Sequence, residues 1–84
     1  MEVIKKYLDL LECELVKVDG NTLIYNDLIE GEEVTTDFTK WCKDLIHNLN
    51  YKIQLDPNNL EIVRGLTRDI QEILEIIYLI HKEL

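Results

Sequence analysis

The C-terminal third of this chain reads as one long apolar helix, and this helix most limits how 84 residues can fold. Apolar residues recur there at alternating steps of three and four, the spacing of a heptad seam. The seam consists of Val63, Leu66, Ile70, Ile73, Ile77, Ile80 and Leu84. Between Ile73 and Ile80 only Glu75 is charged, so this stretch needs cover on more than one side.

The predicted helix is also longer than a chain of this size can enclose. Asp56 suits its N-cap and Pro57 its first turn, which predicts a helix over residues 57–83. Such a helix spans roughly 40 Å, whereas a compact chain of this length measures about 31 Å across. We therefore expect a second copy to cover it in a symmetric homodimer. The expected dimer interface comprises Val63, Leu66, Ile70, Ile73, Ile76, Ile77, Leu79, Ile80 and Leu84.

Two shorter helices are predicted from the same periodicity. Residues 2–13 place apolar side chains at steps of three and four, with charged side chains opposite. Residues 36–49 carry a second stripe, made of Phe38, Trp41, Cys42, Leu45, Ile46 and Leu49, and Asn48 and Asn50 suit the end of this helix. If these two helices cover the seam, the chain is a monomer; a different protein covering the seam is the third alternative.

A small antiparallel sheet completes the expected fold. Two β-prone runs flank Asp19-Gly20-Asn21, which predicts a hairpin over residues 14–26. Residues 26–35 are predicted as a loop, and the alternation of apolar and polar residues over 51–55 predicts a third strand. The chain is thus expected to form a single α+β domain over residues 1–84, in the order α-β-β-α-β-α.

The charge of the chain points to the kind of partner it could bind. Seventeen acidic residues against nine basic ones give a net charge of −8, which argues against direct binding of nucleic acid or of anionic membranes. A basic protein is the expected partner. The expected contact is an acidic loop made of Asp27, Glu30, Glu32, Glu33 and Asp37; a solvated loop is the alternative. The loop lacks the alternating ligand spacing of a calcium site.

Residues able to carry out chemistry are few and scattered. The chain has no serine, and its two cysteines, Cys13 and Cys42, and two histidines, His47 and His81, occur singly, with His47 five residues after Cys42. A zinc site usually needs four ligands with paired spacing, and this pattern is missing. Cys42 and His47 do not share a helix face, which argues against a Cys–His catalytic pair. We expect no enzymatic activity, no metal and no cofactor.

These observations together predict a non-enzymatic protein-binding module. Inhibitors encoded by viruses or phages, which occupy a basic surface of a host protein, have this character, and we expect the chain to act in that way as a homodimer. The alternative is a structural or assembly subunit that docks into a larger complex through its apolar C-terminal helix. No signal peptide or transmembrane stretch is predicted, so a cytoplasmic location with reduced cysteines is expected.

Overall fold

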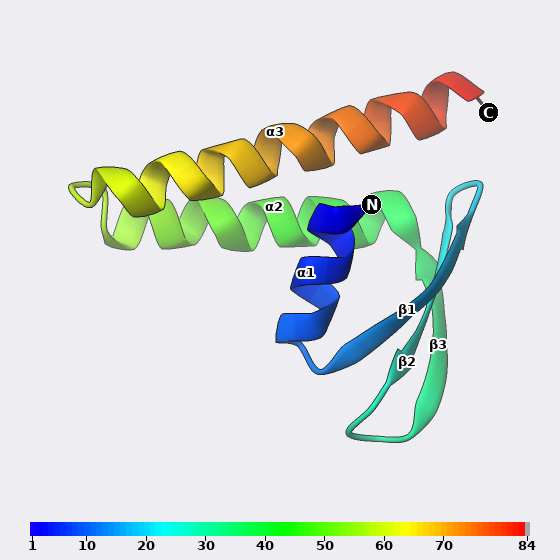
Figure 1. Ribbon diagram of the computed structural model, residues 1–84. Helices are drawn as coiled ribbons and strands as arrows, with labels where there is room; N and C mark the ends of the chain where they lie inside the picture. Colours follow the sequence, from blue (N-terminus) through cyan, green and yellow to red (C-terminus); the bar gives the residue numbers. More distant parts are fainter. Residues whose placement is uncertain (84) are drawn as a thin grey trace.

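The computed structural model describes residues 1–83 as three helices and one three-stranded antiparallel sheet (Figure 1). The α+β class is therefore confirmed, with the element order α-β-β-β-α-α. In chain order the elements are α1 (Glu2–Leu10), β1 (Cys13–Asp19), β2 (Thr22–Asp27), β3 (Glu32–Asp37), α2 (Phe38–Leu55) and α3 (Leu60–Glu83).

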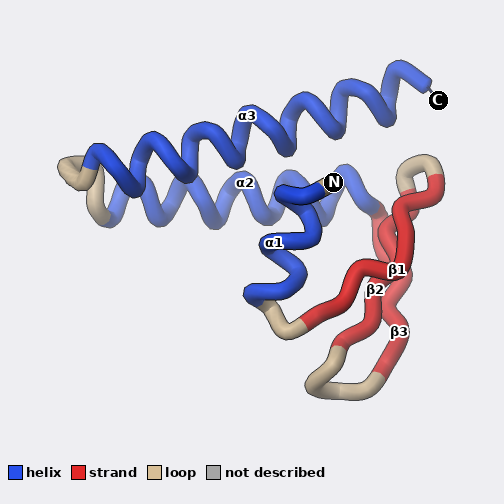
Figure 2. Tube along the Cα trace, in the orientation of Figure 1, coloured by secondary structure: helices blue, strands red, loops and turns tan. Residues whose placement is uncertain are grey.

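The molecule has two arms that meet at an angle. One arm is the helical hairpin, in which α2 and α3 run antiparallel along each other; the other arm is the sheet (Figures 1 and 2). α1 lies in the angle between them and contacts both β1 and α3. The resulting body measures 38 × 34 × 18 Å, so it is broad and thin.

The β1–β2 hairpin confirms the hairpin predicted over residues 14–26. Gly20 has φ +59°, and the strands pair in register from Cys13 opposite Asp27 to Asp19 opposite Thr22, with an irregularity between Leu15 and Lys17. Leu23, near the start of β2, is fully buried. β2 is the central strand and pairs with β1 on one side and β3 on the other.

The third strand is not where the sequence predicted it. Residues 51–55 are the last turn and a half of α2, and the third strand is β3, in a stretch predicted largely as loop. The helix continues past Asn48 and Asn50 because Ile46, Leu49 and Ile53 keep the helical spacing and face inward. The prediction of a strand over 51–55 was therefore wrong.

The helix ends also differ from their predicted positions, for local reasons. Asp37 is the N-cap of α2 and accepts a hydrogen bond from the Lys40 backbone N–H at 2.9 Å. α3 begins at Leu60 rather than residue 57, since the side chain of Asn59 accepts a hydrogen bond from the Ile62 N–H at 3.3 Å. α1 ends at Leu10, before Glu12 adopts φ +58°.

The hydrophobic core lies where α1, the sheet, α2 and α3 meet. Its members are Val3, Ile4, Tyr7, Leu8, Cys13, Leu23, Phe38, Cys42, Leu49 and Ile73. Buried Asp69 of α3 lies next to this core, where it accepts hydrogen bonds from the Tyr7 hydroxyl and from Lys6 Nζ, the latter at 2.8 Å. The core thus occupies one end of the helical hairpin, and the other end, around residues 51–62, is mostly exposed.

Candidate functional site

The predicted acidic loop is a turn and a strand, and its tip is held in place by Asp27. The carbonyl of Asp27 accepts a hydrogen bond from the Gly31 N–H at 2.8 Å, and its carboxylate accepts from the N–H groups of Ile29 and Glu30 at 3.0 and 3.1 Å. Gly31 has φ +71°, a conformation that glycine adopts without strain. The turn over residues 28–31 is therefore defined by its own hydrogen bonds.

The same turn is tied to the connection between α1 and β1. The Leu28 N–H donates a hydrogen bond to the Glu12 carbonyl at 3.1 Å. Because Glu12 follows Leu11, the C-cap of α1, this bond fixes the tip of the β2–β3 hairpin relative to the helical part of the molecule. We call β2, β3 and the turn between them the acidic hairpin.

Two adjacent apolar side chains project from the tip of the acidic hairpin. Leu28 is 60% exposed and Ile29 is 69% exposed. Glu30, Glu32 and Glu33 follow directly and are exposed as well. The sequence prediction did not include Leu28 and Ile29. Asp and Gly are typical turn residues, so two apolar residues placed between Asp27 and Gly31 are a recognisable signal of an exposed apolar tip.

The five acidic residues predicted as one contact do not lie together. Asp27 and Glu32 are paired across the strands at the tip, whereas Asp37 is paired with Thr22 at the opposite end of β3. Asp37 is also engaged as the cap of α2. The hydrogen bond that its carboxylate accepts from the Lys40 N–H lowers its pKa, and a hydrogen bond from the Asn21 side-chain amide adds to this effect. Glu30, Glu32 and Glu33 remain as exposed acidic groups near the tip.

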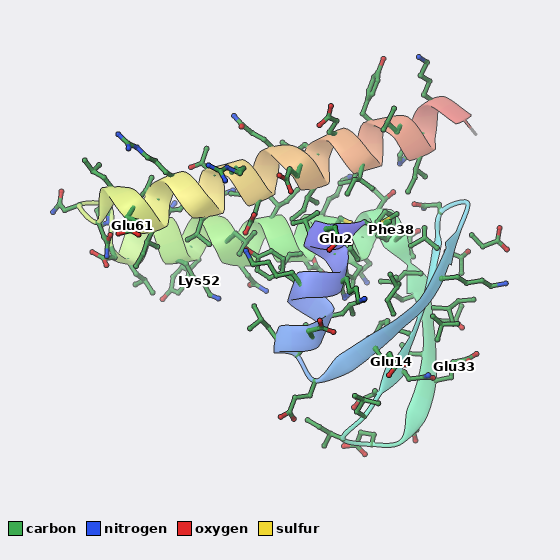
Figure 3. The ribbon with its side chains drawn as sticks, in the orientation of Figure 1. Glu2, Glu14, Glu33, Phe38, Lys52 and Glu61 are labelled. Carbon is green, nitrogen blue, oxygen red and sulfur yellow. The ribbon has the colours of Figure 1, made fainter. Side chains whose placement is uncertain are left out.

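Almost all of the net charge belongs to the sheet. Residues 12–37 contain eight acidic residues and one lysine, while acidic and basic residues nearly balance in the rest of the chain. Glu14 and Glu33 flank Asn26 across neighbouring strands, and both lie on the sheet in Figure 3, away from Lys52 and Glu61 on the helical hairpin. The sheet arm is therefore the strongly negative part of the molecule.

The predicted dimer interface on α3 is largely used within the chain. Ile73 is fully buried, and Leu66, Ile70, Ile76, Ile77 and Ile80 pack against the core. Val63 is half-buried, Leu79 is exposed, and Leu84 lies outside the described residues. α2 extends to Leu55 and runs beside this seam. The homodimer through α3 stays a prediction.

In the part of the chain that the structure describes, both cysteines are buried and both histidines are exposed. Cys13 and Cys42 are free and buried, and burial raises the pKa of both, that of Cys42 to about 12. His47 is exposed, and His81 Nε2 lies 2.9 Å from the Thr39 hydroxyl. No cluster of three or more His, Cys, Asp or Glu residues suited to a metal ion occurs among residues 1–83.

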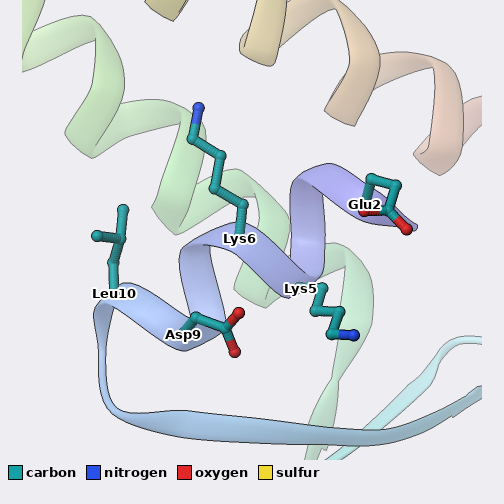
Figure 4. A pocket seen from close by; sticks show the side chains of 5 residues that line it. All are labelled: Glu2, Lys5, Lys6, Asp9 and Leu10. Atoms are coloured by element: carbon teal, nitrogen blue, oxygen red, sulfur yellow. The ribbon is translucent and has the colours of Figure 1, made fainter.

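The outer face of α1 bears a shallow, open hollow (Figure 4). It is lined by Glu2, Lys5, Lys6, Asp9 and Leu10. Its charged groups are of both signs, and Lys6 is already engaged with Asp69. This hollow therefore offers no concentrated charge of one sign to a ligand.

Within the described residues, none of the three helices has the length and apolarity required to cross a bilayer. Comparisons of the chain with protein families, with curated proteins and with solved structures found no match.

Proposed function

We propose that this chain is a non-enzymatic protein-binding module that contacts a basic surface of another protein through the acidic hairpin. The observation that carries the proposal is the exposed pair Leu28 and Ile29 on a turn fixed by Asp27, surrounded by exposed glutamates. Apolar anchors within a polar rim are typical of the residues that dominate binding energy at interfaces. A fixed turn also loses little conformational freedom on binding.

The expected partner surface follows from the chemistry of the tip. An apolar pocket would take Leu28 and Ile29, and lysines or arginines around it would face Glu30, Glu32 and Glu33. The negative sheet accelerates the encounter with such a surface, and the acceleration weakens as salt is added. If the basic surface serves the partner in binding nucleic acid, the module acts as an inhibitor, in the manner of virus- or phage-encoded proteins that block host factors.

Capture experiments with matched variants test the proposal. Wild-type protein, immobilised and incubated with an extract of its source cell or host, should retain a basic protein that elutes with salt. The variant Glu30→Gln/Glu32→Gln/Glu33→Gln should lose most of this binding, and so should Leu28→Asn/Ile29→Asn, because the two variants remove the charged rim and the apolar anchors separately.

The control variant removes three negative charges from the other arm. Glu61, Glu72 and Glu75 lie on α3, and their replacement by glutamine makes the net charge less negative by three, the same change as in the hairpin variant. This control should bind like the wild type. Binding that survives both hairpin variants, or that falls equally in the α3 control, would refute the assignment of the contact to the acidic hairpin.

A structural or assembly subunit is the second candidate, favoured by exposed apolar residues on α3. Leu74 and Tyr78 lie one turn apart on this helix, and both are exposed. Docking into a larger complex through this face should be lost in Leu74→Asp/Tyr78→Asp and retained in both hairpin variants. The capture experiment therefore separates the two candidates with one additional variant.

A cytoplasmic site of action belongs to the same proposal. Cys13 and Cys42 are buried free thiols, and both belong to the hydrophobic core. Thiols of this kind suit a reducing compartment.

A further inference from the structure

An apolar groove runs between the end of α1 and the middle of α2. It has a volume of about 510 Å³ and is lined by Tyr7, Leu10, Leu11, Leu45, Asn48, Leu49, Tyr51 and Lys52. Leu10 and Tyr51 on its two sides are 68% and 58% exposed. Apolar surface that is gathered into a groove and rimmed by polar groups marks an interaction site more often than scattered exposed residues do.

The α2 side of this groove carries a second helical stripe, which is exposed except at Trp41, a half-buried residue that also packs against the core. Its members follow steps of three, four, three and four, namely Trp41, Asp44, Asn48, Tyr51 and Leu55. This is the spacing of the seam along which two helices pack in a coiled coil. Leu55 is 66% exposed, and Asp44 and Asn48 are exposed as well. We call this set the outer stripe of α2.

We propose that the outer stripe of α2 binds a second copy of this chain, with the two α2 helices antiparallel around a two-fold axis at Asn48. This interface goes beyond the proposed function and does not involve the acidic hairpin. A two-fold contact brings one patch against itself, so the residues on either side of Asn48 must be complementary to one another.

The charges on α2 satisfy this requirement. Asp44 lies four residues before Asn48 and Lys52 lies four residues after it. In the antiparallel pair, Asp44 of each copy therefore faces Lys52 of the other, which gives two opposite-charge pairs. α2 contains three lysines and one acidic residue, so the strong negative charge of the sheet is not carried into this contact.

The apolar residues satisfy it as well. Leu45 and Tyr51 lie three residues on either side of Asn48, and Trp41 and Leu55 lie seven residues on either side. Each apolar residue thus faces an apolar residue of the second copy. Asn48 itself faces Asn48, and a single asparagine at a seam position is known to fix the register of paired helices. Leu10 and Leu11, at the edge of the groove, would close over the second helix.

Sedimentation equilibrium with charge-reversed variants tests this interface. Wild-type protein should move from the 10.0 kDa of one chain toward twice that mass as its concentration rises to a few hundred micromolar. Lys52→Asp places an acidic residue opposite Asp44, and Asp44→Lys places a lysine opposite Lys52. Each change should raise the dissociation constant about tenfold or more, because two attractive pairs become repulsive.

Two further samples make the assignment specific to this register. The double variant Asp44→Lys/Lys52→Asp restores both pairs with inverted charges and should associate again. An equal mixture of the two single variants should form a mixed dimer, since every facing pair then has opposite charges. Lys43→Asp makes the same charge change on α2 as Lys52→Asp, but Lys43 does not face Asp44 of the second copy, so this variant should associate like the wild type.

Three results would overturn the inference. These are wild-type protein that stays at the mass of one chain, a double variant and a mixture that do not associate, and a Lys43→Asp variant impaired as much as Lys52→Asp. Circular dichroism of each variant confirms the helix content, which these exposed substitutions should leave unchanged. Since none of the substitutions lies on the acidic hairpin, partner capture and self-association can fail independently.

Discussion

At the scale of single residues, Glu12 is the one non-glycine residue of the described chain with a positive φ. Its φ of +58° is the left-handed region, which costs a residue with a Cβ roughly 1–2 kcal/mol. The conformation turns the chain from the end of α1 into β1 and directs the Glu12 carbonyl toward the Leu28 N–H. The position of the acidic hairpin thus depends in part on one strained residue.

Replacing Glu12 by glycine should therefore stabilise the protein. Glycine adopts this conformation without a steric cost but adds freedom to the unfolded chain, so the expected net gain is about 0.5–1 kcal/mol. Urea unfolding monitored by circular dichroism measures the change. Glu14→Gly, two residues later within β1, is the control and should destabilise the protein, because glycine weakens a strand. A loss of stability in Glu12→Gly would contradict the explanation.

At the scale of elements, one polar cluster joins α1 to α3. Burial raises the pKa of Asp69, but the hydrogen bonds from Lys6 and Tyr7 and the charges of Lys6 and Arg68 outweigh it and lower the pKa below 3.8. Burial, aided by Asp69, raises the pKa of Tyr7 above its ordinary value of 10.0, so the phenol remains a hydrogen-bond donor in alkaline solution as well as at neutral pH. The Lys6 ammonium also lies 5.2 Å from the centre of the Tyr7 ring.

The Asp69 cluster predicts a specific dependence of stability on pH. A carboxyl whose pKa is lower in the folded state contributes its full stability above the unfolded value of 3.8 and loses it as the pH falls through the folded value. Asp69→Asn should lower the free energy of unfolding by about 1.5–3 kcal/mol at pH 7. The difference in the free energy of unfolding between wild type and variant should become smaller below about pH 4. Urea unfolding at pH 7, 4 and 3 tests this. A difference in unfolding free energy that stays constant over this pH range would contradict the role assigned to the Asp69 carboxylate.

The elements also show why the sequence predicted the fold only in part. The β1–β2 hairpin and α1 were predictable because their turn residues and periodicity are local signals. The stretch Tyr51–Leu55 fits both the alternation of a strand and the spacing of a helix, and the alternation led to the prediction of a strand. In the structure Tyr51 and Leu55 are exposed, and Ile53 continues the inward-facing stripe of α2. β3 was missed because its glutamates have a low intrinsic preference for strands. Its pairing with β2 stabilises the strand despite that low preference.

The candidate site was predictable to a similar extent. The sequence located the exposed glutamates of the acidic hairpin, since charge needs no knowledge of the fold. It could not show that the side chains of Asp27 and Asp37 are engaged in a turn and a helix cap, because both roles depend on hydrogen bonds to neighbouring backbone. The outer stripe of α2 was hidden because the sequence predicted α2 to end before Tyr51.

At the scale of the whole molecule, stability should be uneven along the helical hairpin. The core lies at the end where α1 and the sheet meet α2 and α3, and the far end has only half-buried residues such as Ile53 and Val63 between the helices. Regions with few buried apolar contacts open locally at a lower free energy than the core. The far end is therefore expected to fray while the rest stays folded.

Native-state hydrogen exchange in dilute solution should show this gradient. Backbone amides at residues 51–55 and 63–65 should have opening free energies about 2 kcal/mol or more below those of Cys42–Leu49, because the latter lie over the core. Exchange measured by NMR resolves the two groups. Equal protection along the whole of α2 would show that the two ends of the helical hairpin unfold as one cooperative unit.

The three-stranded sheet has a consequence for how the protein behaves when concentrated. β3 pairs with β2 on one side only, so its other edge presents unpaired backbone groups, which are a template for fibril-like stacking. Glu32 and Glu33 lie on that edge strand and would face like charges on any chain that added to it. These glutamates therefore also act as gatekeepers against aggregation, and this role does not depend on binding to a partner.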